Sequence, residues 1–266
     1  MKINMHNQHV NMPINMRVIA CDIFGTTVDW RTGVADQVAA VAAGAGLAGT
    51  GTAGTGTAGT GTAGVDLDAG RFADAWRDRY RPSMQAVNDG ERDWVYLDTL
   101  HRESLDALLD EQGLASAFDE PARQRMVQAW HRLPAWDDSV AGLTRLRTRY
   151  TLAALSNGGF ALLTNLVKAA GLPFDCILSA ELAQRYKPAP EPYLTAARLL
   201  DVAPGEILMV AAHGWDITGA RAAGLQTAFL ERPRERGPHR TADKAADHPA
   251  DLSVSSFTEL ADVLNC

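Results

Sequence analysis

Apolar, strand-like runs alternate along this chain with helical stretches, and this alternation restricts its fold more than any other feature. The strand-like runs are RVIACDIF (17–24), YTLAALS (150–156), CILSA (176–180), EILMVAA (206–212) and QTAFLE (226–231). The helical stretches between them are FALLTNLVKAAGL, PEPYLTAARLLD and DITGARAAGL, and they are closed by Gly or by DVAPG. Apolar strands joined by helices are typical of a parallel sheet that is covered on both faces. The sequence therefore predicts a doubly wound, mostly parallel α/β core.

Residues 32–134 follow a different pattern and are almost free of strand-like runs. They carry three amphipathic helical stretches, RFADAWRDRYRPSMQAV (71–87), TLHRESLDALLDEQGL (99–114) and EPARQRMVQAWHRL (120–133). A helical segment that interrupts an α/β pattern after its first strand indicates an inserted cap. We therefore expect a core made of residues 17–31 and 135–266, with residues 32–134 as a helical cap domain.

Two segments lack any packing pattern. Residues 49–64 repeat GTGTA, and these small residues favour a flexible loop because they have nothing to bury and lose much backbone entropy when ordered. A glycine-rich phosphate-binding loop would need a strand before it and Lys-Ser/Thr after it, but VDLDAG follows here. Residues 1–16 are polar, rich in Asn and Met, and lack the apolar centre of a signal peptide, which indicates a disordered extension.

Charge and cysteine content exclude several classes of partner. The 25 basic and 32 acidic residues give a formal charge of −7 without any Lys/Arg run, so neither nucleic acid nor an anionic membrane surface is expected. No stretch is long and apolar enough to span a membrane. Cys21, Cys176 and Cys266 are odd in number and lack metal-site spacing, which favours reduced thiols and a cytoplasmic location.

Polar residues stand just beyond several of the predicted strands. Asp22 follows the apolar start of the first strand, Ser156 ends the second, and Asp216 closes the segment AAHGWD after the fourth. Lys187 lies in RYKPAPEPY, between the third strand and a helix. Because ligands of open α/β sheets bind beyond the carboxyl ends of the strands, we expect these residues to converge on one site.

The motifs DIFGTT, LSNGG, YKPAPEPY and HGWDITGARAAG make the chain similar to the haloacid dehalogenase superfamily, and within it to the L-2-haloacid dehalogenases. The similarity covers nearly all of the chain after residue 16. It implies a Rossmann-like core with a helical cap, a homodimer, and a small 2-halocarboxylate as the substrate. The implied reaction is metal-independent hydrolysis of (S)-2-haloacids to 2-hydroxyacids through an ester on Asp22.

Phosphatases of the same superfamily carry two further acids, at positions that are Phe24 and Ala211 here. The first of these acids protonates the leaving group and the second binds Mg²⁺, so their absence disfavours metal-assisted phosphate-ester hydrolysis. A halide leaving group needs neither protonation nor a metal. We therefore expect no metal and no other cofactor.

The resemblance assigns roles to the residues nearest the proposed nucleophile, Asp22. Lys187 would keep the Asp22 carboxyl ionised, and Thr26 would donate a hydrogen bond to it. Ser156 and neighbouring backbone N–H groups would hold the substrate carboxylate. A turn or helix-capping aspartate is the plain structural alternative for Asp22.

The departing halide would be received by Arg77 and Asn157. Arg77 matches a Trp-Arg pair of the family, although Arg79 or Arg81 could serve instead, and an exposed helix arginine is the structural alternative. The remaining residues expected at the substrate pocket are Phe24, Tyr193 and Trp215, which core packing alone could also explain.

His213 is a departure from the family pattern. Five and three residues before Asp216 the family usually has Ser and Asn, where this chain has Ala211 and His213. The usual Asn helps to orient the water that hydrolyses the ester. Because imidazole can orient water and also accept a proton near neutral pH, we expect His213 to act in ester hydrolysis, with Asp216 fixing its position or sharing its role. The alternative is that His213 marks a changed activity.

Other functions stay open at this point. The same nucleophile could open a strained ring such as azetidine-2-carboxylate, with a ring nitrogen in place of the halide. A phosphatase is a weaker alternative, as is a non-catalytic acid-binding protein, against which the retention of Asp22, Lys187 and Asp216 argues. GTTVD also resembles phosphonoacetaldehyde hydrolases, but residues 31–134 contain no lysine to form the Schiff base of that reaction.

Overall fold

A six-stranded sheet, in which all neighbouring strands run parallel, forms the centre of the molecule. The computed structural model describes residues 15–50 and 66–266 of the chain. In spatial order the strands are β5 (Cys176–Ser179), β4 (Thr151–Ser156), β1 (Val18–Cys21), β6 (Ile207–Ala211), β7 (Gln226–Leu230) and β8 (Leu252–Val254). The apolar runs predicted five of these strands, and the doubly wound, Rossmann-like α/β core is confirmed.

Strand β1 lies where the sheet changes its winding direction. The chain builds β4 and β5 on one side of β1, and β6, β7 and β8 on the other. Cys21, the last residue of β1, is in register with Ala154 of β4 and Val210 of β6, so the three strands end near the same edge of the sheet. The crevice at such a reversal is the usual ligand site of an open α/β sheet.

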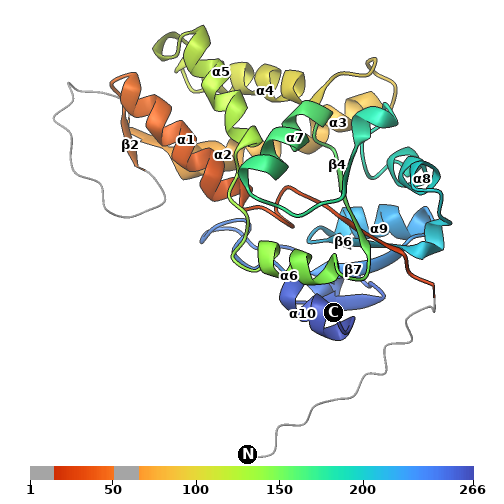
Figure 1. Cartoon of the computed structure of the whole chain (residues 1–266). Helices are drawn as coiled ribbons and strands as arrows, with labels where there is room; N and C mark the ends of the chain where they lie inside the picture. The colour runs from red at the N-terminus through yellow and green to blue at the C-terminus, as the bar shows by residue number, and fades with distance from the viewer. Residues whose placement is uncertain (1–14, 51–65) are drawn as a thin grey trace, which may run out of the picture.

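The described residues also form ten α-helices, which are labelled in Figure 1. They are α1 (Trp30–Gly44), α2 (Ala69–Asp78), α3 (Tyr80–Asn88), α4 (Leu97–Glu111), α5 (Glu120–Gln128), α6 (Ser139–Leu146), α7 (Phe160–Ala169), α8 (Pro190–Leu199), α9 (Gly214–Ala222) and α10 (Phe257–Val263). Short 3₁₀ turns lie at η1 (Ala115–Ala117), η2 (Ala129–His131), η3 (Ala180–Leu182), η4 (Pro204–Glu206) and η5 (Ala245–Asp247). Of the helices described, none has the length and apolar character needed to cross a membrane.

Side-chain caps fix where several helices begin. Asp29, Asp68 and Asp119 each accept a hydrogen bond from a backbone N–H in the first turn of α1, α2 and α5. Ser256 does the same for α10. These bonds satisfy N–H groups that have no partner inside the helix. The Asp29 cap lets α1 begin after only eight residues that follow the end of β1.

Side chains of β1 alternate between two hydrophobic clusters, one on each face of the sheet. Ile19 and Cys21 join the cluster to which α6, α7 and α10 contribute, whereas Val18 and Ala20 join the cluster of α8 and α9. Both faces of a parallel sheet are buried in this way, and the strands are therefore apolar throughout instead of alternating with polar residues. This explains the continuous runs in the sequence.

The described chain between β1 and β4 is mainly helical and contains α1 to α6, of which α1 to α5 gather in the upper half of Figure 1. A short parallel pair, β2 (Ala48–Thr50) and β3 (Asp66–Asp68), accompanies them. The predicted boundary between residues 31 and 32 falls inside α1. The division into a core and a cap domain stays a prediction.

Two predicted segments lie partly outside the described residues. Of the predicted N-terminal extension (1–16), only residues 15 and 16 are described. Of the predicted flexible loop (49–64), residues 51–64 lie outside, and residues 49 and 50 belong to β2, so the loop prediction was wrong for these two. Their backbone pairs with residues 67 and 68 of β3, which needs no side-chain pattern and therefore left no signal in the sequence.

Gly142 allows helices α6 and α10 to cross closely. A Cβ at this position would lie 2.4 Å from the backbone carbonyl carbon of Phe257. We expect Gly142→Ala to lower the free energy of unfolding by about 1–3 kcal/mol, the usual cost of overpacking, as measured by denaturant titration. Gly44→Ala is the matched control, because its Cβ would meet nothing within 4 Å. It should leave stability unchanged or raise it by up to about 1 kcal/mol; an equal loss in both variants would contradict the packing argument.

Candidate active site

The carboxyl ends of β1, β4 and β6 meet at one edge of the sheet and bring the predicted residues together. Asp22 directly follows β1, Ser156 ends β4, and His213 lies two residues beyond the end of β6. Asp22, Lys187 and His213 are all buried. The segments after β1, β4 and β6 therefore meet at one place in the structure, as predicted.

Both oxygens of the Asp22 carboxylate accept hydrogen bonds. Lys187 Nζ donates to Oδ1 over 3.0 Å, and Thr26 Oγ1 donates to Oδ2 over 2.9 Å. Thr26 is itself held by the backbone N–H of Ala212, which donates to its hydroxyl oxygen. Burial alone would raise the pKa of Asp22, but the charges and hydrogen bonds of Lys187 and His213 hold that pKa well below its usual range. The carboxylate is therefore ionised at neutral pH.

Lys187 is only 2% exposed, and its ammonium group donates three hydrogen bonds. The acceptors are Asp22 Oδ1, the carbonyl oxygen of Leu155 at 2.9 Å, and Asp216 Oδ2 at 2.5 Å. Burial disfavours the charged form, but the carboxylates of Asp216 and Asp22 raise the pKa of Lys187 above its usual value. A buried, charged lysine is thus held at a fixed position beside Asp22.

Asn157 bonds to the backbone of Lys187, and Tyr193 bonds to its partner acid, Asp216. The Asn157 amide accepts from the backbone N–H of Lys187 and donates to its carbonyl oxygen, at 2.7 and 3.1 Å. The Tyr193 hydroxyl donates to Asp216 Oδ1 at 2.6 Å and is fully buried. Both side chains therefore position the lysine and its partner acid.

His213 lies between two carboxylates. Its Nδ1 is 3.3 Å from Asp22 Oδ2, and its Nε2 is 3.0 Å from Glu235 Oε1. Burial alone would lower the pKa of His213, but the charges and hydrogen bonds of Glu235 and Asp22 raise it to about 9. The ring is stacked on Trp215, with 5.5 Å between the ring centroids. In the free protein His213 is therefore a cation at neutral pH.

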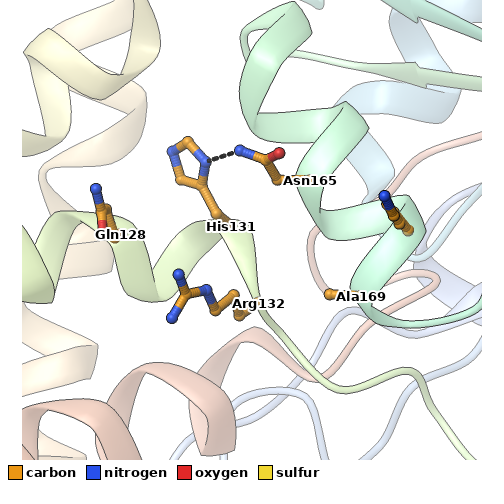
Figure 2. A pocket seen from close by; sticks show the side chains of 6 residues that line it. Gln128, His131, Arg132, Asn165 and Ala169 are labelled. Atoms are coloured by element: carbon orange, nitrogen blue, oxygen red, sulfur yellow. Dashed lines mark hydrogen bonds between the residues drawn. The ribbon is translucent and has the colours of Figure 1, made fainter.

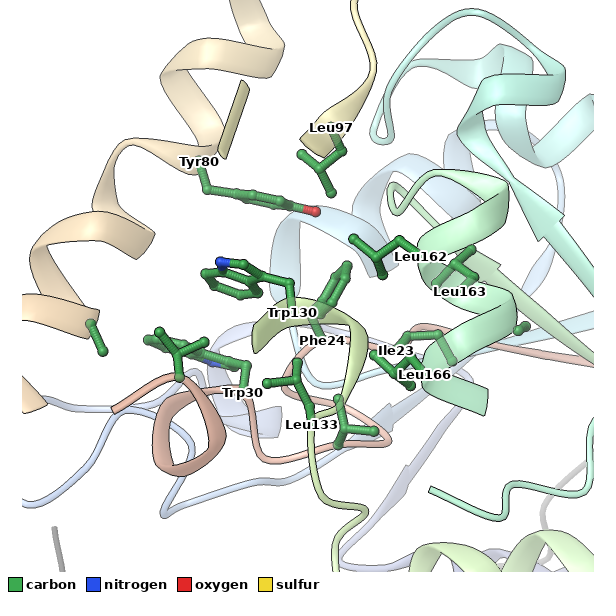
Figure 3. Packing of buried hydrophobic residues seen from close by; sticks show 14 of the residues in the cluster. Ile23, Phe24, Trp30, Tyr80, Leu97, Trp130, Leu133, Leu162, Leu163 and Leu166 are labelled. Atoms are coloured by element: carbon green, nitrogen blue, oxygen red, sulfur yellow. The ribbon is translucent and has the colours of Figure 1, made fainter. Parts of the chain in front are cut away.

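Arg77 reaches from α2 into a cluster of aromatic rings. Its guanidinium carbon lies 4.0 Å from the ring centroid of Tyr80 and between 5.2 and 5.9 Å from those of Trp30, Trp130 and Phe24. Figure 3 shows Tyr80 and Trp30 packed beside Trp130 and Phe24. Arg77 Nη1 is buried and has no hydrogen-bond partner among the described residues. The rings stabilise the cation from its faces and leave this N–H group free for an anion.

A cavity of about 100 Å³ opens beside His213. It is lined by Arg77, Asp78, Tyr80, Arg81, His213, Trp215 and Arg236. Three arginines and a cationic histidine in so small a space favour a small anion. A larger hollow of about 530 Å³ lies between η2 and α7 (Figure 2), but none of the predicted site residues lines it. No cluster of three or more His, Cys, Asp or Glu side chains within 15–50 and 66–266 is arranged to hold a metal ion.

Residues 16–224 match the family model described as haloacid dehalogenase-like hydrolase. The chain belongs to this family. Its site, with an aspartate directly after β1 and a lysine paired to it, lies at the carboxyl edge of the family's parallel sheet.

Several relatives of this hydrolase are named haloacid dehalogenases. (S)-2-haloacid dehalogenase 1 of Pseudomonas sp. (strain CBS-3) is 33% identical over 62% of this chain and 70% of its own length. The crystal structure of a defluorinating L-2-haloacid dehalogenase is 42% identical, with a TM-score of 0.85 over 95% of this chain and 96% of its own. A second L-2-haloacid dehalogenase structure, also 42% identical, has a TM-score of 0.82 over 94% and 99%.

The structure places three predicted residues of this hydrolase differently from the roles expected for them. Asp216 bonds to Lys187 and Tyr193, and Glu235 takes the place beside His213 that we expected Asp216 to have. Tyr193 stands behind Asp216, inside the hydrophobic cluster of α8 and α9. The Asn157 amide already makes two hydrogen bonds to the backbone of Lys187. A halide bound by Asn157, as predicted, would have to share the amide N–H group with the Lys187 carbonyl.

Sequence reasoning missed Glu235. It lies in the charged segment ERPRERGPH after β7, where an acid among arginines suggests a solvated surface. It is instead 2% exposed and also accepts a hydrogen bond from Trp30 Nε1 at 2.8 Å. Burial would raise the pKa of Glu235, but the charge and hydrogen bond of His213 lower it to about 2. Only the fold of the loop after β7 brings it to the site.

The raised pKa of His213 predicts how stability depends on pH. Because the folded protein binds this proton more tightly than the unfolded chain, the stabilisation is complete below pH 6.5 and is lost as pH rises through about 9. The expected loss is about 3 kcal/mol, measured by denaturant titration across this range. His213→Asn should abolish the fall, and His131→Asn, outside the site, should keep it. The same fall in both variants would refute the assignment.

Proposed function

We propose that this hydrolase converts small (S)-2-haloacids to 2-hydroxyacids through an ester on Asp22. The observation that carries the proposal is the Asp22 carboxylate, which Lys187 keeps ionised and which contacts His213, a residue that lines a small cavity together with three arginines. Relatives at 42% identity over most of the chain, named L-2-haloacid dehalogenases, support the same substrate class. A small carboxylate anion suits the cationic cavity.

In the first step, an oxygen of Asp22 attacks C2 of the substrate and forms a C–O bond. The halide leaves with the electron pair of the C–X bond, so no proton is needed and none is supplied by Phe24, which occupies the position of the phosphatase acid. Lys187 and Thr26 orient the carboxylate for this attack. Ser156, buried at the end of β4, and neighbouring backbone N–H groups would bind the substrate carboxylate.

Arg77 is the proposed acceptor of the halide. Its guanidinium is shielded by four aromatic rings, and one buried N–H group has no protein partner among the described residues. An anion placed there gains a desolvated charge-assisted hydrogen bond. Arg79 is a poorer candidate, since it donates to the Ala75 carbonyl and to Glu111. Arg81 lines the cavity and lies over Trp215, where it can attract the substrate anion.

In the second step, water attacks the carboxyl carbon of the Asp22 ester and releases the 2-hydroxyacid. Attack at this carbon regenerates the Asp22 carboxylate without inverting C2 again. His213 would act on that water, and its 3.3 Å distance from Asp22 Oδ2 supports this role. Trp215 forms the wall of the cavity on the other side of the ring.

The remaining features of the proposal rest on the sequence and the resemblance. We expect catalysis without a metal or other cofactor, since Ala211 offers no ligand at the position of the phosphatase acid. The free thiols of Cys21, Cys176 and Cys266 support a cytoplasmic location. A homodimer is proposed from the resemblance alone, and a helical cap of residues 32–134 is proposed from the helical pattern of the sequence and from the resemblance.

Asp22→Asn should abolish turnover without changing the fold, because the amide has nearly the same shape but is a far poorer nucleophile. Halide release in EDTA, measured by ion chromatography, would be followed for chloro-, bromo- and fluoroacetate and both 2-chloropropionate enantiomers. Asp29→Asn is the control, since it keeps the cap of α1 and lies outside the site. In H₂¹⁸O, a single turnover of wild type should label Asp22. Label in the hydroxyacid on the first turnover, or a requirement for Mg²⁺, would contradict the mechanism.

Arg77→Gln should lower kcat/KM for halide release by about 100-fold or more, because it removes a preorganised donor where negative charge develops. Arg79→Gln, two residues away, removes only the bonds to Ala75 and Glu111 and should change kcat/KM little. Steady-state kinetics on bromo- and chloropropionate compare the two variants. Equal losses in both would mean that Arg77 does not receive the halide.

A further inference from the structure

His213 and Glu235 form a buried pair, and the proposed chemistry gives a role to His213 but none to Glu235. His213 is 3.0 Å from Glu235 on one side of its ring and 3.3 Å from Asp22 on the other, and both residues of the pair are 2% exposed. A ring whose two nitrogens both face carboxylate oxygens donates from both only as imidazolium. The ring is therefore protonated for as long as both carboxylates are ionised.

Two neighbours besides His213 hold the Glu235 carboxylate. Trp30 Nε1 donates to the same oxygen, Oε1, that faces His213, and Arg236 Nε is 3.7 Å from the other oxygen. Gly25 leaves the necessary room, because a Cβ there would lie 2.5 Å from Glu235 Oε1. The acid cannot turn to a different partner without breaking these contacts, so it holds the His213 ring in one orientation.

We infer that Glu235 is a positioning residue, which keeps Nδ1 of His213 facing Asp22 so that His213 becomes the general base for the ester only after Asp22 has reacted. This inference rests on the proposed ester mechanism. Glu235 keeps the remaining proton on Nε2, and the free electron pair then lies on Nδ1, on the side of the ester. This is the arrangement by which a carboxylate sets the tautomer of a catalytic histidine.

The protons balance over one cycle. Formation of the ester removes the negative charge of Asp22, and His213 then loses its Nδ1 proton to solvent. Neutral His213 takes a proton from the attacking water as the new C–O bond forms at the carboxyl carbon of Asp22. The bond between that carbon and the substrate oxygen breaks, and the alkoxide takes the proton from His213. The resulting Asp22 carboxylic acid returns its proton to His213, which restores the ion pair.

The charges around His213 support this sequence. The groups facing the ring or its two partners are Asp22 after β1, Arg77 and Asp78 on α2, Arg81 on α3, Lys187 before α8, and Glu235 and Arg236 after β7. Asp22 is one of the two carboxylates that raise the pKa of His213 to about 9. When Asp22 is esterified, one anion is lost while the cations stay, so the pKa of His213 falls.

Glu235→Gln tests the inference because it keeps the shape of the side chain and removes its charge. We expect a burst of about one halide per site at the wild-type rate, followed by slow turnover, with an ester on Asp22 detected by intact mass. Ester hydrolysis should slow by about 100-fold, within the usual contribution of a general base. Glu231→Gln is the matched control, since Glu231 lies in the same segment and accepts from the backbone of Ala245 outside the site. It should hydrolyse the ester at the wild-type rate.

Two results would overturn the inference: loss of the burst in a folded Glu235→Gln protein, or unchanged ester hydrolysis. Should that variant fail to fold, the double variant His213→Asn/Glu235→Gln replaces it, because it removes both charges of the buried pair. Hydrolysis no slower than in His213→Asn alone supports a role through His213, and a further 10-fold loss contradicts it.

The His213 ring can also be followed without turnover. In ¹⁵N NMR, Glu235→Gln should shift the titration of His213 to lower pH, and an unchanged titration would overturn the inference. Failure of the proposed function would appear differently, as the absence of halide release by wild type from every haloacid.

Discussion

The buried ammonium group of Lys187 is the constraint on which the rest of the site depends. A lysine that is 2% exposed keeps its charge only if its desolvation is offset, and Asp22, Asp216 and the Leu155 carbonyl supply that offset. One acceptor directly follows β1, one lies near the end of β4, and one lies in the first turn of α9. The position of one nitrogen therefore ties β1, β4 and the start of α9 into a single geometry, and Asp22 is oriented as a consequence.

The main sheet was predictable because burial on both faces leaves an apolar run for each central strand. β1 and β6, covered on both sides, are almost wholly apolar in sequence. β8 (Leu252–Val254) was missed because it has three residues at the edge of the sheet and an exposed Ser253 in the middle. A strand of this length is defined by its backbone pairing with β7, which no side-chain pattern records.

Site residues that follow the ends of strands could be predicted from the sequence. Site residues whose position depends on the fold of a loop could not. Asp22 and the residues after β6 lie at the sheet edge because the topology places them there. Lys187, in the loop before α8, was found from its motif and not from periodicity. Glu235 had neither signal, since nothing in ERPRERGPH distinguishes a buried acid from its exposed neighbours. The misassigned partner of His213 follows from this: the nearest acid in sequence, Asp216, was already bound to Lys187.

Histidine at position 213 and glutamate at position 235 depend on each other physically. Without Glu235, the buried Nε2 of His213 would lose its hydrogen-bond acceptor. Without His213, the buried Glu235 carboxylate would lose its cationic partner and keep only the Trp30 N–H as a close donor. Removing one partner of a buried ion pair typically costs about 3–5 kcal/mol, because the other charge stays desolvated. Asparagine at position 213 would therefore leave the Glu235 charge uncompensated. The two residues therefore act as one unit in this protein, and replacing His213 alone leaves a buried charge without its partner.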